Sequence, residues 1–142
     1  MTHTSFDGAA FRAFRDHPRK GPIQMLNLVR LRDAPAYPPG HDGTRAETAA
    51  EAYRLYGQGS GPVLMRLGGR IVWRGRPEFG LIAPTDERWD IAFIAEYPSA
   101  EVFAAMLKDP DYRAAMAHRQ AAVADSRLIR MAPLDAGDSF GG

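Results

Sequence analysis

Four stretches of the chain have the apolar pattern of β-strands. Alternation with a period of two places successive side chains on opposite faces of a sheet. In the first of these stretches both faces carry large apolar side chains, so we expect both faces to be covered. The predicted strands are residues 23–32, 69–79, 89–97 and 126–134.

Two capped helices are predicted between the third and fourth strands. Ser99 and Asp109 are preferred N-cap residues, and Pro110 suits the first turn of the helix that Asp109 starts. The stretch from residue 97 to residue 119 therefore turns back over the sheet as a helix pair.

Helical periodicity also appears before the first and the second strand. An apolar stripe predicts a short N-terminal helix over residues 6–15 that Ser5 caps. A helix over residues 45–56 follows the Pro- and Gly-rich loop 33–44 and is interrupted by glycines. Ser60 is expected to cap a further short helix.

The second and third strands form a predicted hairpin centred near Ala83. One face carries Ile71, Trp73, Trp89, Ile91, Phe93, Ala95 and Tyr97. The other carries Arg70, Val72, Arg74, Arg76, Asp90, Ala92, Ile94 and Glu96. In this register Arg70 lies opposite Glu96 and Arg76 opposite Asp90. Such cross-strand pairs contribute a few tenths to about 1 kcal/mol each.

The order of these elements predicts an α+β fold of the ferredoxin-like type. Strand, helix, strand, strand, helix pair and strand follow one another, which is the split βαβ pattern with an antiparallel four-stranded sheet. Helices cover one face of such a sheet, so the other face calls for a partner such as a second copy. We expect one domain over residues 1–134, with its core at 22–134, an extra N-terminal helix and a flexible tail at 135–142.

Composition narrows the function classes. The chain has 142 residues, no cysteine and a net charge of +1, which gives no general attraction to nucleic acid or to anionic membranes. Its longest apolar run, residues 91–95, is too short for a membrane span, and its start lacks the apolar run of a signal peptide. We expect a cytoplasmic protein with no nucleic-acid partner and no membrane partner.

Two motifs resemble a known family. They are GGRIVWRG at residues 68–75 and YPSAEVFAAMLKDPDYRAAMAHR at residues 97–119. Together they are similar to the domain-of-unknown-function family 1330, of the dimeric α/β-barrel superfamily. The resemblance covers residues 22–134 and implies a homodimeric α/β barrel, but it supplies no catalytic residues. The matching positions are Gly68, Gly69, Arg70, Tyr97, Pro98, Ser99, Asp109, Pro110, Tyr112 and Arg119.

Arginines and one amide are the first candidates for ligand binding. Arg70, Arg74 and Arg76 on one strand face could hold an anion, because guanidinium groups match carboxylates and phosphates. The alternative is that Glu96 and Asp90 already pair with this face. Asn27 either lines a pocket or bonds to a neighbouring backbone group, since a buried amide needs a partner.

Three further residues complete the candidate set. Trp73 and Trp89 share the apolar hairpin face, where a place in the core is the alternative to ligand stacking. His118 is either a ligand-binding group or a surface or interface histidine. Some cofactor-free monooxygenases and haem-degrading enzymes of the superfamily use an Asn, a Trp and a His from corresponding elements, which Asn27, Trp89 and His118 resemble.

The sequence favours a homodimeric protein that binds a small anionic or aromatic molecule. It leaves open whether turnover follows. One alternative is a cofactor-independent monooxygenase or a haem-degrading enzyme, and another is a non-catalytic dimerisation or accessory domain. No cofactor and no metal are expected, since the histidines have no metal-ligand spacing.

Overall fold

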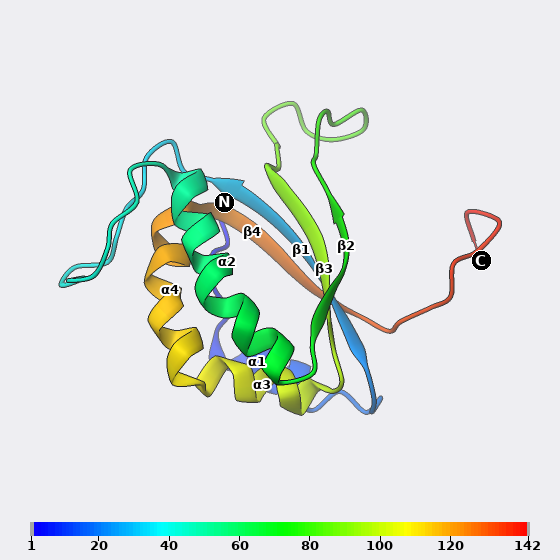
Figure 1. Ribbon diagram of the computed structural model, residues 1–142. Coiled ribbons are helices and arrows are strands. Elements are labelled where there is room, and N and C mark those ends of the chain that lie inside the picture. The colour runs from blue at the N-terminus through cyan, green and yellow to red at the C-terminus, as the bar shows by residue number, and fades with distance from the viewer. Residues whose placement is uncertain (1, 142) are drawn as a thin grey trace.

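The computed structural model describes residues 2–141; Met1 and Gly142, the outer ends of the expected domain and tail, lie outside them. Helices and strands follow in the expected order after one N-terminal helix (Figure 1). The elements are α1 (Gly8–Arg15), β1 (Ile23–Leu31), α2 (Ala49–Arg66), β2 (Arg70–Gly75), β3 (Ile91–Tyr97), α3 (Ala100–Lys108), α4 (Pro110–Ala122) and β4 (Val123–Met131).

The strands form one four-stranded antiparallel sheet in the order β2-β3-β1-β4. This is the ferredoxin-like arrangement, so the predicted fold class is confirmed. Helices α2, α3 and α4 cover one face (Figure 1). The main core lies between that face and the helices, because one side of β1 and β3 is apolar there. Its buried members include Ile23, Met25, Val63, Leu64, Ala95, Tyr97, Phe103, Met106 and Tyr112.

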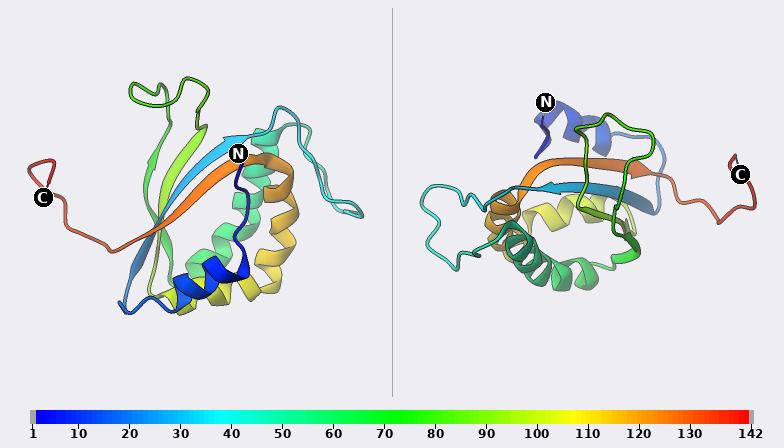
Figure 2. Two further views of the ribbon diagram at one scale, coloured as in Figure 1. Left: turned by 180° about the vertical axis from the view of Figure 1, so that it is seen from behind. Right: turned by 90° about the horizontal axis from the view of Figure 1, so that it is seen from above.

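Helix α1 lies at the β4 edge of the sheet (Figure 2). It packs on α3 through Phe14 and Phe103, whose ring centroids are 5.1 Å apart. Its N-cap is Asp7, which accepts a hydrogen bond from the Ala10 nitrogen at 2.8 Å. The prediction of Ser5 as the cap was wrong, because the first helical residue is Gly8 and the cap must directly precede it.

Helix α2 is continuous, contrary to the two helices predicted from its glycines. It begins after Thr48, which accepts from the Glu51 nitrogen at 3.1 Å, and it runs through Pro62. Packing overrides the low helix propensity of this segment, since Val63 and Leu64 are buried. Ser60 therefore lies inside α2 and caps nothing.

A bulge in β2 changes the predicted hairpin faces. Arg70 pairs with Glu96 as expected, but after Ile71 the register shifts, and Trp73 then lies opposite Ile94. Directly opposite residues share a face. Trp73 therefore joins the face of Arg70, and the prediction that placed it on the other face was wrong. The extra residue is Val72, which has no opposite partner in the ladder.

The bulge also moves the later arginines. Arg74 lies opposite Phe93, on the helix-covered face, so it does not share a face with Arg70. The predicted pairing of Arg76 with Asp90 was also wrong. β2 ends at Gly75, and an Asp90 carboxylate oxygen instead accepts from the Leu31 nitrogen at 2.7 Å.

The second face of the sheet has no helix over it (Figure 2). We call it the outer face. Trp73 and Ile129 on it are 51% and 47% exposed. Pairing places Leu26, Leu28 and Ile94 on the same face. Within residues 2–141, no helix combines the length and the apolar character needed to cross a membrane.

Candidate functional site

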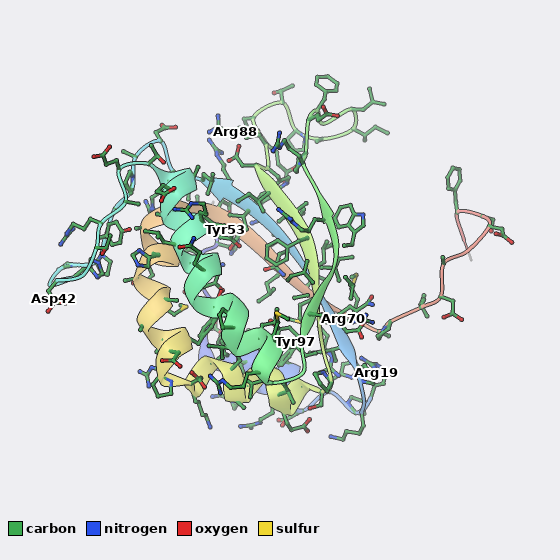
Figure 3. All side chains as sticks on the ribbon, viewed as in Figure 1. Arg19, Asp42, Tyr53, Arg70, Arg88 and Tyr97 are labelled. Atoms are coloured by element: carbon green, nitrogen blue, oxygen red, sulfur yellow. The ribbon has the colours of Figure 1, made fainter. Side chains whose placement is uncertain are left out.

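The six residues predicted to bind a ligand do not gather in one place. Arg70 lies on the outer face with a 72% exposed side chain, 3.6 Å from a Glu96 carboxylate oxygen (Figure 3). Trp73 lies on the same face. Trp89 precedes β3, and its ring lies 5.2 Å from the Arg127 guanidinium carbon.

Asn27 and Arg74 both lie on the helix-covered face, in one row across Phe93. The Asn27 amide donates to the Met25 carbonyl at 3.0 Å, so its hydrogen-bonding need is met within its own strand. Arg74 and Arg76 line a hollow of about 340 Å³ at the end of β2. This hollow is smaller than the N-terminal one described below, and it lies at the sheet margin.

His118 belongs to a separate cluster under the loop between β1 and α2. Its Nδ1 lies 2.8 Å from the Tyr37 hydroxyl, which also accepts from the Ala46 nitrogen at 2.9 Å. Burial, followed by the nearby His41, lowers the pKa of His118. The neutral imidazole can accept the Tyr37 proton at Nδ1, so this cluster tethers the loop to α4.

The three residues that resemble an oxygenase set are thus in three surroundings. Asn27 bonds to backbone, Trp89 contacts Arg127, and His118 bonds to Tyr37. Within residues 2–141, no hydrogen bond or ring contact joins any two of them. The same described residues contain no group of three His, Cys, Asp or Glu side chains that could hold a metal ion.

A larger hollow lies elsewhere, between the N-terminal segment and the body of the protein. It has a volume of about 550 Å³, which falls in the range of about 300–1,000 Å³ usual for small-molecule sites. We call it the N-terminal cavity. Its walls come from residues 3–14, α3, α4 and β4. They include Phe6, Phe11, Phe14, Phe103, Leu107, Tyr112, Met116, Arg119, Ser126 and Leu128.

A row of phenylalanines forms the apolar wall of this cavity. The Phe6 and Phe11 rings stack at 5.4 Å, and Phe11 and Phe14 stack at 6.1 Å. Phe103 from α3 continues the row. The spacing of α1 places Phe11 and Phe14 on one helical face, because residues three apart share a face, and Phe6 adds to the row from the segment before α1. A flat apolar group would find matching surface here.

Arg119 and Ser126 form the polar end of the cavity. Arg119 Nη1 donates to the Thr4 carbonyl at 2.8 Å, and Nη2 lies 3.5 Å from the Ser126 hydroxyl. That hydroxyl donates to the His3 carbonyl at 2.7 Å. The same two side chains therefore hold the N-terminal segment and face the cavity.

Tyrosine hydroxyls lie beside this polar end. Tyr112 lines the cavity, and its hydroxyl is 2.9 Å from that of Tyr56. Burial raises the pKa of Tyr56 well above its usual value, and burial likewise raises the pKa of Tyr53 to about 12 (Figure 3). Both hydroxyls stay protonated at neutral pH, so they do not act as bases.

Sequence reasoning missed Arg119 as a site residue, although the family motif contained it. Tyr112 belongs to the same motif and was likewise not among the candidate site residues. The signal that could have indicated both residues is the family motif at residues 97–119, which contains them. Its Pro and Asp residues serve to start helices. What the sequence could not show is that the N-terminal segment returns to α4, since Arg119 and Thr4 are 115 positions apart.

Comparison with known proteins supports the family assignment. The model of the domain of unknown function (DUF1330) matches residues 44–132. No curated protein matches the chain. The structure resembles that of the methylated RPA0582 protein, with a TM-score of 0.88 and 56% identity over 97% of this chain and 100% of that chain.

Two further solved structures are similar. The RPA0582 protein of unknown function from Rhodopseudomonas palustris gives a TM-score of 0.86 and 55% identity over 96% of this chain and 100% of that one. A dimeric protein of unknown function with a ferredoxin-like fold from Bacteroides fragilis gives a TM-score of 0.47 and 14% identity over 78% of this chain and 94% of that one. The family match, which spans more than half of the chain, shows that this chain belongs to the family described as domain of unknown function 1330.

Proposed function

We propose that this protein binds a small anionic or aromatic molecule in the N-terminal cavity. The observation that carries the proposal is the combination of a phenylalanine wall with the Arg119 guanidinium in one hollow of about 550 Å³. Small-molecule sites have this character, with apolar walls and a few placed polar groups. The proposal concerns binding, and it is compatible with an enzyme or a carrier.

Filling the cavity provides the test. Ala10 lines the cavity on α1, whereas Ala9 beside it does not. A thermal-shift screen of small aromatic compounds and small acids should raise the melting temperature of the wild type, because ligand binding stabilises by mass action. Ala10→Phe should abolish these shifts, and Ala9→Phe should keep them. Equal shifts in both variants, or no shift in the wild type, would refute binding at this cavity.

We also propose that the working unit is a homodimer that is joined through the outer face. The partly exposed Trp73 and Ile129, with Leu26, Leu28 and Ile94 between them, give this face a continuous apolar centre. A second copy presents the same patch, as a two-fold interface requires. The ion pair of Arg70 and Glu96 lies at its margin.

A further inference from the structure

Arg119 is the cation of the N-terminal cavity that lacks a carboxylate partner. Two other charged side chains line the hollow, and both are engaged. Asp7 caps α1, and Arg127 pairs with Asp125 at 2.8 Å. Among the ion pairs of residues 2–141, none includes Arg119. A partly buried guanidinium without a counter-ion attracts an anion, because charges away from water are normally paired.

Neutral oxygens occupy the Arg119 donors in this structure. The Thr4 carbonyl accepts from Nη1, and the Ser126 hydroxyl lies at 3.5 Å from Nη2, a long contact. The Ser126 hydroxyl in turn donates a hydrogen bond to the His3 carbonyl. A carboxylate is a stronger acceptor than a carbonyl, and it can take two parallel hydrogen bonds from one guanidinium. A ligand carboxylate can therefore replace these backbone oxygens.

The wall beside Arg119 defines the rest of the ligand. Phe6 and Phe11 present stacked rings to the cavity, and Met116 and Tyr112 come from α4 on the other side. Aromatic rings pack on such surfaces in stacked or edge-to-face geometry, and a methionine sulfur also suits a ring. A short aromatic acid would satisfy both ends of the cavity at once.

We infer that the ligand of the N-terminal cavity is an aryl carboxylate, with its ring on the phenylalanine wall and its carboxylate on Arg119. This inference rests on the proposed binding function and specifies its ligand class. Residues 3–5 release the Arg119 and Ser126 donors when the acid enters. The hydrogen bond from the His3 nitrogen to Asp125, at 2.8 Å, continues to hold the segment near the cavity.

The first test compares acids with their own amides on the wild-type protein. Isothermal titration with 3-phenylpropanoate and 3-phenylpropanamide, and with phenylacetate and its amide, keeps ring and length constant while the charge changes. We expect each acid to bind at least about tenfold more tightly than its amide, because hydrogen bonds between charged groups are stronger than neutral ones. Equal affinities would overturn the aryl-carboxylate inference and leave the binding function standing. No binding of these compounds, nor of any screened aromatic compound or small acid, would refute the binding function itself.

The second test assigns the carboxylate to Arg119. Arg119→Met should lower the affinity for 3-phenylpropanoate to that of the amide and leave the affinity for the amide unchanged. Arg119→Lys should give an intermediate affinity, since lysine keeps the charge but not the paired donors. Arg113→Met, an exposed site on the same helix, is the matched control and should bind like the wild type. An unchanged preference for the acid in a folded Arg119→Met variant would overturn the assignment.

Discussion

Two glycines of α2, Gly57 and Gly59, show how much one methyl group matters at different places on the same helix. An added Cβ at Gly59 would lie 2.9 Å from the Ala115 Cβ, closer than such atoms approach in folded proteins. At Gly57 it would meet nothing within 4 Å. Gly59 therefore permits the close approach of α2 to α4, whereas Gly57 only weakens the helix.

The two glycine-to-alanine substitutions should change the stability of the protein in opposite directions. Gly57→Ala should raise the free energy of unfolding by about 0.5–1 kcal/mol, because alanine is the better helix former. Gly59→Ala gains the same propensity, but it overpacks the contact with Ala115, a defect that costs about 1–3 kcal/mol. We expect a net loss of about 1 kcal/mol. Urea unfolding followed by circular dichroism measures both, and a Gly59→Ala variant as stable as Gly57→Ala would contradict the close contact.

At the residue scale, the sequence predicted the opposite-charge pairing of Arg70 correctly and the sheet face of Arg74 wrongly. Arg70 was expected opposite Glu96, and the structure places it there. Arg74 was expected beside Arg70, but a single bulge placed it on the other face. Alternation of residue types is the same with or without a bulge, so the register of Arg74 depends on tertiary packing that a local pattern does not contain.

At the scale of elements, the starts of α3 and α4 were predicted correctly, whereas the predicted caps Ser5 and Ser60 were wrong. Ser99 accepts from the Val102 nitrogen at 3.2 Å, and Asp109 accepts from the Asp111 nitrogen at 2.9 Å. Caps are local, because the side chain serves a backbone group two or three residues away. The continuity of α2 was not predictable for the opposite reason, since contacts with α4 support it and lie far along the chain.

The loop between β1 and α2 is tied to α4 by His118, and this tie should depend on pH. The folded pKa of His118 is lowered, mainly by burial, so between that pKa and about 6.5 the unfolded chain binds more protons than the folded one. Stability must then fall as pH drops through about 6.5. His118→Asn should lack this part of the pH dependence.

Two measurements check this prediction. A histidine titration by NMR should give a pKa below 6.5 for His118, and His41→Gln should raise that pKa, because a nearby like charge is removed. Unfolding in urea between pH 7.5 and pH 5 should show the wild type losing stability more steeply than His118→Asn. If the free energy of unfolding depends on pH equally steeply in both proteins, the pH-dependent tie between the loop and α4 through His118 is contradicted.

At the scale of the whole molecule, the order of elements was enough to predict the ferredoxin-like fold. Few topologies join these elements with short connections, and the split βαβ pattern is one of them. The N-terminal cavity was not predictable in the same way. It forms because residues 3–14 pack against α3, α4 and β4, and no periodic pattern specifies where a short terminal segment returns.

The proposed homodimer leads to a prediction about the outer face. Ile129→Asp places a charge in the apolar centre of the interface, so this variant should be monomeric at micromolar concentration while the wild type is dimeric. Ile82→Asp is the control, because Ile82 is 96% exposed on the loop between β2 and β3. Light scattering coupled to size exclusion measures the mass. A monomeric wild type would end the proposal.

The C-terminal tail should contribute little to folding. It runs away from the body beyond the end of β4 (Figure 1), and Phe140 on it is fully exposed. Deletion of residues 135–142 should change the free energy of unfolding by less than about 0.5 kcal/mol, as for other exposed positions. Hydrogen exchange should show these amides unprotected. A loss of more than about 1 kcal/mol would show that the tail packs.

The bulge at Val72 has a consequence for how copies of this chain repel or attract one another. A regular β2 would have aligned Arg70, Arg74 and Arg76 as a cationic stripe on the sheet surface without helices. Two copies meeting there would bring like charges together, which is unfavourable. By inserting one residue, the strand places Trp73 where Val72 would have been, opposite Ile94, and Gly75 where Arg74 would have been, opposite Ala92. One extra residue in β2 thereby reduces the positive charge on the outer face, so that two copies of this face can meet without bringing like charges together.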